Sequence, residues 1–248
     1  MPTVKLILEY DGTNYAGWQR QPDQPTIQEA VESALYLLTQ SHASVIAAGR
    51  TDAGVHALGQ VASFRINKAW TAAEWIRGFN ARLPKDIAVR SAAIMPDEFH
   101  ARYAARGKLY EYRIVNRPER PAVARTYSWH IGPFLKIEPM IQAGNALIGS
   151  HDFSSFEGTL TDNEDPMCNI QQLTVTRQDD RLNIHIYADR FLKHMVRNIV
   201  GTLVEIGHGK RSVMNISEIL AARDRRRAGR TAPPQGLFLV KVDYATIS

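Results

Sequence analysis

The sequence predicts an α+β fold in which two ferredoxin-like βαββαβ halves join into one sheet with a central cleft. Two observations lead to this prediction. Segments with the two-residue period of strands alternate with segments of helical period, and the order of elements in residues 1–105 recurs in residues 106–248. No low-complexity linker separates the halves near Arg106 and Gly107, so we expect them to pack together.

The first half opens with a strand over 4–10. A helix follows over about 25–38, because Thr26 and Glu29 have capping-box spacing and apolar residues recur at helical intervals. Thr71 and Glu74 form a second capping box, which begins a helix that reaches about residue 83. The remaining strands are expected over 44–48, 60–66 and 86–94.

The second half has the same order of elements. Tyr110, Tyr112 and Ile114 alternate along a strand over 108–115, and a helix is expected over 137–148. Two strands joined by a polar hairpin turn at 178–181 come next, followed by a strongly apolar helix and a closing strand. The ranges expected for these last elements are 172–177, 182–188, 191–206 and 237–243.

Composition narrows the functional classes. The formal net charge of +5 is a mild bias toward polyanions. Cys168 is the only cysteine, which excludes an intramolecular disulfide and a cysteine-based zinc site. The N-terminus lacks signal-peptide features, and no apolar stretch reaches membrane-spanning length. We therefore expect a cytoplasmic protein that does not bind a membrane.

The common catalytic motifs are absent from the sequence. It contains no phosphate-binding P-loop, no G-x-S-x-G and no H-E-x-x-H, and its eight histidines show no metal-ligand spacing. Phosphoryl transfer, serine hydrolysis and zinc chemistry are thus unsupported, and we expect neither a metal nor another cofactor.

The most unusual segment is 48–60, where three glycines flank the triplet Arg50-Thr51-Asp52. Glycine permits tight backbone turns, so this loop can present Asp52 in a fixed place. Taken alone, the pattern leaves two alternatives open. An aspartate in a glycine-rich loop commonly caps a turn, and it serves more rarely as a catalytic carboxylate.

Several motifs occur in an order that covers nearly the whole chain. They are Tyr10-Asp11-Gly12, Gly17-Trp18-Gln19-Arg20-Gln21, Gly49-Arg50-Thr51-Asp52-Ala53-Gly54-Val55-His56, Phe99-His100-Ala101-Arg102, Lys108-Leu109-Tyr110-Glu111-Tyr112, His151-Asp152-Phe153, Phe191-Leu192, His194-Met195-Val196-Arg197-Asn198, and Ala232-Pro233 with Gly236-Leu237. In these motifs the chain resembles the TruA-type tRNA pseudouridine synthases. The resemblance implies the pseudouridine-synthase type of sheet, with the Asp loop in 1–105 and the active-site Tyr and Arg in 106–248.

The resemblance also implies an activity and its residues. The reaction is the isomerisation of uridine to pseudouridine at positions 38, 39 and 40 of the tRNA anticodon stem-loop. By the resemblance, Asp52 is the nucleophile, Arg197 is its ionic partner and Tyr110 contacts the flipped uracil and takes part in catalysis. Arg50, Thr51 and Leu237 complete the substrate-binding set. RNA contacts are expected from Arg20, Arg102, Tyr103 and Arg106, and the family works as a homodimer with tRNA crossing both subunits.

The reaction itself makes physical demands. It breaks an N–C bond and forms a C–C bond without redox change or phosphate transfer, so it needs no cofactor. Aspartate is a nucleophile only when ionised. Burial raises the pKa of a carboxyl group, and a nearby arginine offsets that effect. The base must also leave the RNA stack, which costs a few kcal/mol.

Alternatives to these roles remain open. Without the resemblance, Tyr110 is read as sheet core and Arg197 as a solvated arginine. The basic run over 223–230 either contacts phosphate or is a solvated helix end. The loop over 161–169 carries three acids where the family usually has basic residues, which weakens any role of that loop in RNA binding. Two other functions are a non-catalytic RNA-binding protein on the same scaffold and a synthase with a different RNA target.

Overall fold

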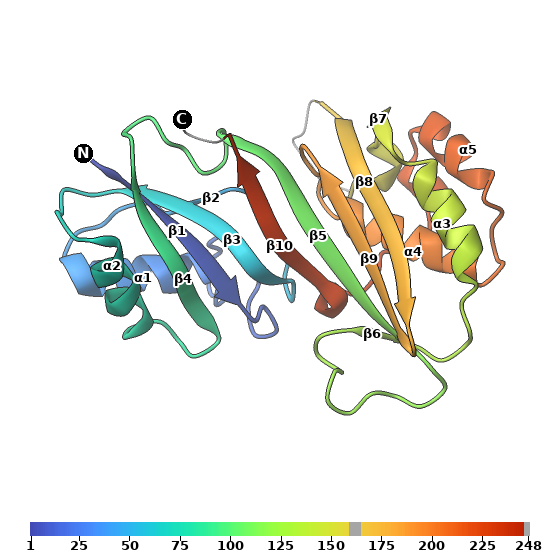
Figure 1. Cartoon of the computed structure of the whole chain (residues 1–248), viewed down its shortest axis with the longest axis horizontal. Helices are drawn as coiled ribbons and strands as arrows, with labels where there is room; N and C mark the ends of the chain where they lie inside the picture. The colour runs from blue at the N-terminus through green and yellow to red at the C-terminus, as the bar shows by residue number, and fades with distance from the viewer. Residues whose placement is uncertain (159–164, 246–248) are drawn as a thin grey trace. The chain divides into compact units, whose positions relative to one another are not determined.

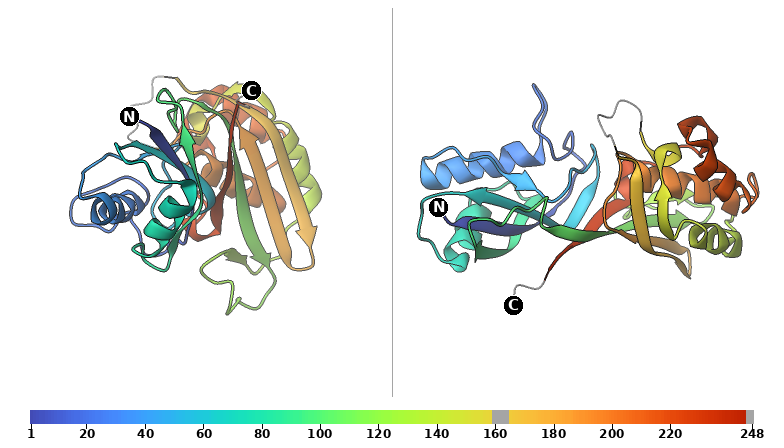
Figure 2. Two further views of the ribbon diagram at one scale, coloured as in Figure 1. Left: turned by 60° about the vertical axis from the view of Figure 1, so that its left-hand side comes forward. Right: turned by 90° about the horizontal axis from the view of Figure 1, so that it is seen from above.

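The computed structural model describes residues 1–158 and 165–245. The chain divides into two compact units, the first made of Met1–Arg106 with the chain from Phe238 onward, and the second of Gly107–Leu237. Figures 1 and 2 show the elements of each unit. The closing strand is thus grouped with the first unit, whereas its place in the sequence suggested the second half.

The sheet of the first unit is built around β3 (His56–Arg65). On one side β3 pairs antiparallel with β1 (Thr3–Tyr10), which pairs antiparallel with β4 (Ile87–Met95). On its other side β3 has two short partners. One end pairs with the two-residue β2 (Ile46–Ala47), and the other end pairs in parallel with β10 (Leu237–Tyr244). The second strand of the ferredoxin-like pattern is therefore shortened, and β10 fills the remaining edge.

Two capped helices complete this unit. α1 (Ile27–Thr39) begins after Thr26, whose side chain accepts a hydrogen bond from the Glu29 backbone N–H. α2 (Ala72–Asn80) begins with the full predicted capping box, in which Thr71 and Glu74 each accept from the other's backbone N–H. α2 packs on β4 and beside α1, and its aromatic side chains fill the core against β3.

The second unit has an antiparallel sheet in the order β5 (Ala105–Asn116), β9 (Arg181–Ala188), β8 (Met167–Gln178) and β7 (Gly149–Asp152). A short strand, β6 (Trp129–Ile131), runs parallel to β5. The predicted hairpin between β8 and β9 is confirmed, with Asp179 at a φ of 54° in the turn. Its helices are α3 (Ile137–Asn145), α4 (Met195–Gly207) and α5 (Asn215–Ala222).

α4 is the element that matters most for the site. It is packed against α3, and most of its residues are buried, which explains its apolar sequence. The helix begins at Met195 rather than at residue 191, because His194 before it adopts a left-handed φ of 59°. This places Arg197 in the first turn of α4.

The α+β class is confirmed, while the short strands β6 and β7 and the short helix α5 escaped the sequence pattern. β6 and β7 have three and four residues and α5 has eight, so none spans enough periods to be distinguished from a loop. Over the described residues, every helix is too short or too polar to cross a membrane.

Candidate active-site residues

Asp52 lies on the loop between β2 and β3, and backbone hydrogen bonds fix that loop to the neighbouring one. The Trp18 N–H donates to the Thr51 carbonyl at 3.0 Å, and the Gly54 N–H donates to the Tyr15 carbonyl at 3.2 Å. Within the loop, the Val55 N–H donates to the Asp52 carbonyl at 3.1 Å and closes a turn. The backbone on both sides of Asp52 is therefore held in place.

Two glycines of the neighbouring loop allow this approach. A Cβ on Gly12 would lie 2.0 Å from the Val55 carbonyl oxygen. A Cβ on Gly17 would lie 2.6 Å from the Thr51 oxygen, and Gly17 also has a φ of +101°, which side chains rarely adopt. The loop that carries Asp52 and the loop that carries Trp18 thus form one interlocked structure.

Three buried and neutral polar side chains, connected by hydrogen bonds, hold the loop in place. The Tyr10 and Thr51 hydroxyls lie 2.8 Å apart, and Gln60 donates from its amide to the Tyr10 hydroxyl at 3.3 Å and to the Gly49 carbonyl at 2.8 Å. Burial raises the pKa of Tyr10 to about 12, against the opposing hydrogen bonds from Thr51 and Gln60. All three groups are neutral at physiological pH, so they fix the loop without adding charge.

His56 ties the end of this loop to the C-terminal strand. Its ring stacks on that of Phe238 with centroids 4.7 Å apart, and its Nδ1 accepts a hydrogen bond from the Gly12 N–H at 3.1 Å. Asp11 Oδ1 also lies 3.1 Å from Nδ1. The same ring nitrogen therefore faces both the Gly12 N–H and the Asp11 carboxylate.

The predicted site residues of the first unit differ in their exposure to solvent. Asp52 is half-buried and Arg50 is exposed, whereas Thr51 is buried with its hydroxyl in the Tyr10 chain. Four residues expected to contact RNA are also exposed. They are Arg20, which pairs with Glu32 at 3.0 Å, Arg102, Tyr103, whose ring stacks on His100 with centroids 4.2 Å apart, and Arg106.

Tyr110 and Tyr112 lie on β5 in the second unit and differ in their surroundings. Tyr112 is fully buried, and its hydroxyl donates to the Pro233 carbonyl at 2.7 Å. Burial raises the pKa of Tyr112, against the charges of Arg197 and Arg230. Tyr110 is also buried, and its ring meets Phe191 edge to face with centroids 4.9 Å apart. Tyr112 therefore belongs to the core, and Tyr110 is the tyrosine that borders the Phe191 segment.

Arg197 is half-buried and is held by the segment that precedes β10. Its Nε donates to the Ala232 carbonyl at 2.8 Å, and the Ala232 N–H donates to the Arg197 carbonyl at 3.0 Å. Gly201, one turn after Arg197, lets this segment approach α4 closely, because a Cβ there would lie 1.7 Å from the Arg230 carbonyl oxygen. Leu237, a few residues further along, is buried.

The basic run of 223–230 is largely engaged within the protein. Arg223 pairs with Asp152 at 2.8 Å, and Arg226 pairs with Asp224 at 2.8 Å. Arg225 donates to the buried side chain of Asn198 at 2.9 Å, and burial lowers the pKa of this arginine. The run is thus neither uniformly solvated nor uniformly available to phosphate.

The acidic loop of 161–169 and Cys168 are the two other features that the sequence singled out. Of the acidic loop, Asp162 and Glu164 lie outside the described residues, and Asp165 pairs with Arg190 at 2.9 Å. Cys168 is buried, which raises the pKa of its thiol to about 12, against the charge of Arg190. Its thiol therefore stays protonated at neutral pH. Across residues 1–158 and 165–245, no three His, Cys, Asp or Glu side chains gather as a metal site would require.

Comparison with known proteins now decides the family. The family model described as tRNA pseudouridine synthase matches residues 6–104 and 143–245. The chain belongs to this family. It is 44% identical over 244 residues to tRNA pseudouridine synthase A of Thermoanaerobacter sp. (strain X514), with 98% of this chain and 100% of that protein covered. The enzyme of the same name from Legionella pneumophila (strain Lens) is 45% identical over 242 residues, covering 97% of this chain and 92% of the relative.

The family membership confirms the resemblance seen in the motifs. Asp52 and Arg197 fall inside the ranges matched by the family model, and Tyr110 falls between them. The enzyme of Myxococcus xanthus is 44% identical over 245 residues, 98% of this chain and 92% of its own, so such alignments also cover the segment around Tyr110. The roles of the individual residues stay predictions.

The sequence pattern does not predict the supporting residues. Tyr10 and Gln60 both hold the Asp52 loop, yet no pattern marks them for that role. A polar side chain in an apolar stretch is a weak sign of a buried hydrogen bond, because the same residue types are common on surfaces.

Proposed function

We propose that this protein isomerises uridine to pseudouridine at positions 38, 39 and 40 of the tRNA anticodon stem-loop. Similarity to tRNA pseudouridine synthase A over 98% of the chain supports the class of reaction. The observation that carries the proposal is the half-buried Asp52 on a loop whose backbone is fixed on both sides. A nucleophile needs this combination of access and fixed geometry.

In the proposed reaction the ionised Asp52 carboxylate attacks the flipped nucleotide, at the ribose C1′ or the base C6. The N1–C1′ bond breaks, the uracil turns, and C5 bonds to C1′. The bond to Asp52 breaks as well, which frees the carboxylate for another turnover. A proton leaves C5 and N1 gains one, so the product is an isomer of the substrate. Atoms and electrons balance without a cofactor.

The other residues serve this step by resemblance to the family. Tyr110 contacts the flipped uracil and takes part in proton transfer, with Thr51 and Leu237 in the substrate-binding set. Arg197 is the ionic partner of Asp52. Arg50, which is exposed, occupies the gap that the flipped base leaves in the RNA.

RNA binding is proposed for Arg20, Arg102, Tyr103 and Arg106. All four are exposed, and Tyr103 presents a ring that a base can stack on. We further propose that the protein acts in the cytoplasm as a homodimer, with one tRNA crossing both subunits.

Mapping pseudouridine in unmodified tRNA after incubation with the pure protein tests the proposal. We expect product at positions 38, 39 and 40, with and without a metal chelator, and none with Asp52→Asn. Pseudouridine at other positions would show a different RNA target. Tight tRNA binding without product would show a non-catalytic RNA-binding protein.

A further inference from the structure

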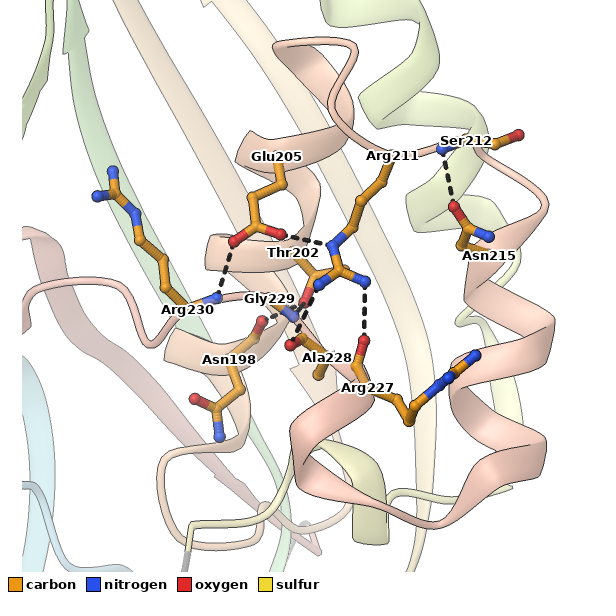
Figure 3. Close-up of polar contacts among 10 residues, drawn as sticks. All are labelled: Asn198, Thr202, Glu205, Arg211, Ser212, Asn215, Arg227, Ala228, Gly229 and Arg230. Atoms are coloured by element: carbon orange, nitrogen blue, oxygen red, sulfur yellow. Dashed lines mark hydrogen bonds and ion pairs between the residues drawn. The ribbon is translucent and has the colours of Figure 1, made fainter.

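The segment 228–232 lies along α4 and gives three of its backbone N–H groups to that helix. The Gly229 N–H donates to Thr202 Oγ1 at 2.8 Å and the Arg230 N–H donates to Glu205 Oε1 at 3.0 Å (Figure 3). The third is the Ala232 N–H, which donates to the Arg197 carbonyl at 3.0 Å. The segment is thus fixed at three points along one helix.

Glu205 is the centre of the charged part of this arrangement. Its second carboxylate oxygen accepts from Arg211 Nε, and Arg211 Nη1 donates to the Arg227 carbonyl at 2.8 Å (Figure 3). Burial alone would raise the pKa of Glu205, but the hydrogen bonds from Arg230 and Arg211 outweigh it, and the pKa lies below its usual range. Glu205 is therefore a carboxylate at neutral pH and accepts from both sides.

Close packing prevents the segment from sliding along the helix. A Cβ on Gly229 would lie 2.7 Å from the Thr202 Cα, and a Cβ on Gly201 would lie 1.7 Å from the Arg230 carbonyl oxygen. With backbone against backbone at two points, a shift at one point moves the whole segment. The position of the Ala232 carbonyl therefore depends on the contacts at Thr202 and Glu205 as well as on the bond of the Ala232 N–H to the Arg197 carbonyl.

That carbonyl orients Arg197, because it accepts from Arg197 Nε at 2.8 Å. A guanidinium group is planar, so a hydrogen bond at Nε fixes the direction of its other donors. Thr202 and Glu205 follow Arg197 by five and eight residues on α4, which is roughly 7–12 Å along the axis. Their influence on the guanidinium is consequently indirect, through the segment.

We infer that Thr202 and Glu205 are positioning residues for Arg197, which hold the segment 228–232 so that the Ala232 carbonyl fixes the guanidinium for the reaction. The inference rests on the proposed function, since it assigns the two residues a role in that reaction. Neither residue is expected to touch the RNA.

The first test compares Thr202→Val with Thr202→Ser. Valine has the shape of threonine but leaves the Gly229 N–H without its acceptor, whereas serine keeps the hydroxyl. We expect single-turnover pseudouridine formation at saturating enzyme to fall about tenfold for Thr202→Val and less than about twofold for Thr202→Ser. The dissociation constant for tRNA should stay within about twofold of wild type in both, since phosphate contacts dominate affinity.

A double-mutant cycle separates positioning from general loosening. In an Arg197→Lys background, which already lacks the planar fork, Thr202→Val should reduce turnover by less than about twofold. Ser155→Ala is the matched control. The Ser155 hydroxyl also accepts from one backbone N–H, that of Asp224, and donates to one carbonyl, that of Ile219, in the same unit. It should leave turnover at the wild-type level.

The outcomes are distinguishable. Additive losses for Thr202→Val and Arg197→Lys, or an equal loss for Ser155→Ala, would overturn the positioning role while leaving the proposed function intact. Wild-type protein that forms no pseudouridine would overturn both. If Thr202→Val does not fold, as judged by thermal unfolding, Glu205→Gln takes its place in the same cycle, with the same coupled loss expected.

Discussion

The Asp52 loop and the segment 228–232, which holds Arg197, are packed in the same way but differ in the polar groups that fix them. In each, a glycine lets one backbone lie directly on another, Gly17 against the Thr51 carbonyl and Gly201 against the Arg230 carbonyl. The Asp52 loop then rests on neutral hydroxyl and amide groups. The segment 228–232 is tied by the neutral Thr202 hydroxyl and, in addition, by charged groups, with Glu205 between Arg211 and the Arg230 N–H.

The difference shows what each side chain requires from its support. A nucleophilic carboxylate must stay ionised in a partly buried place, and a second buried carboxylate nearby would oppose that. Neutral groups such as Tyr10 and Gln60 fix the loop without this cost. A guanidinium is charged at any physiological pH, so a carboxylate such as that of Glu205 is compatible with its support.

The largest expected effect is on the Asp52 side. Asp52→Asn should abolish pseudouridine formation, because an amide of the same shape is not a nucleophile. Binding of tRNA should stay within about threefold, since the loop keeps its backbone contacts and phosphate contacts dominate affinity. Single-turnover product formation and equilibrium binding at one salt concentration measure the two quantities. Turnover near the wild-type rate would remove Asp52 from the mechanism.

Arg197→Lys is a milder substitution, and we expect a smaller loss of turnover from it than from Asp52→Asn. Arg197→Lys keeps the charge but loses the planar fork and the Nε donor to the Ala232 carbonyl. We expect turnover to fall about tenfold or more, from losing a charge-assisted contact worth roughly 1.5–3 kcal/mol. The tRNA dissociation constant should hardly move. Weak binding with normal turnover at saturation would instead place Arg197 on the RNA.

Most of the fold could be predicted from the sequence because its elements carry strong local patterns. The capping box of Thr71 and Glu74 and the hairpin turn at Asp179 appear where the sequence places them. The place of the last strand could not be predicted the same way. Its pairing with β3 at Phe238 and Leu239 joins residues far apart in the chain, and no local period records such a contact.

The candidate site was predictable in part for a similar reason. Asp52, Tyr110 and Arg197 stand in recognisable motifs, and family membership now supports that resemblance. The groups that hold these three residues in place do not stand in recognisable motifs. Thr202 and Glu205 belong to a helix whose apolar pattern hides a buried hydroxyl and a half-buried carboxylate, and their partners are backbone N–H groups, which have no sequence signature.

Lowering the pH should loosen the segment 228–232, which Glu205 holds, before it loosens the Asp52 loop, which neutral groups hold. The folded pKa of Glu205 is lowered from its ordinary value of 4.5, so its contribution to stability is complete above that pH and is lost as the pH falls below it. Hydrogen exchange corrected for intrinsic rates should show the Arg230 amide losing protection below about pH 4.5 before the Trp18 amide does. Glu205→Gln should remove this difference, and equal loss at both amides in wild type would contradict it.

The smallest effect is expected from substitutions in the basic run of 223–230, and the structure shows which of its residues to replace. Arg225 donates to Asn198 and Thr231, so replacing it would disturb the segment that leads to Arg197. Arg226 and Arg227 are exposed and are the proper pair to replace. If they contact phosphate, the double alanine variant should weaken tRNA binding and reduce the salt dependence of the association constant by about one unit of slope per lost contact.

Turnover at saturation should not change, because neither side chain holds Ala232. An unchanged slope would show that Arg226, already paired with Asp224, and Arg227 are solvated surface charges and that the RNA lies elsewhere.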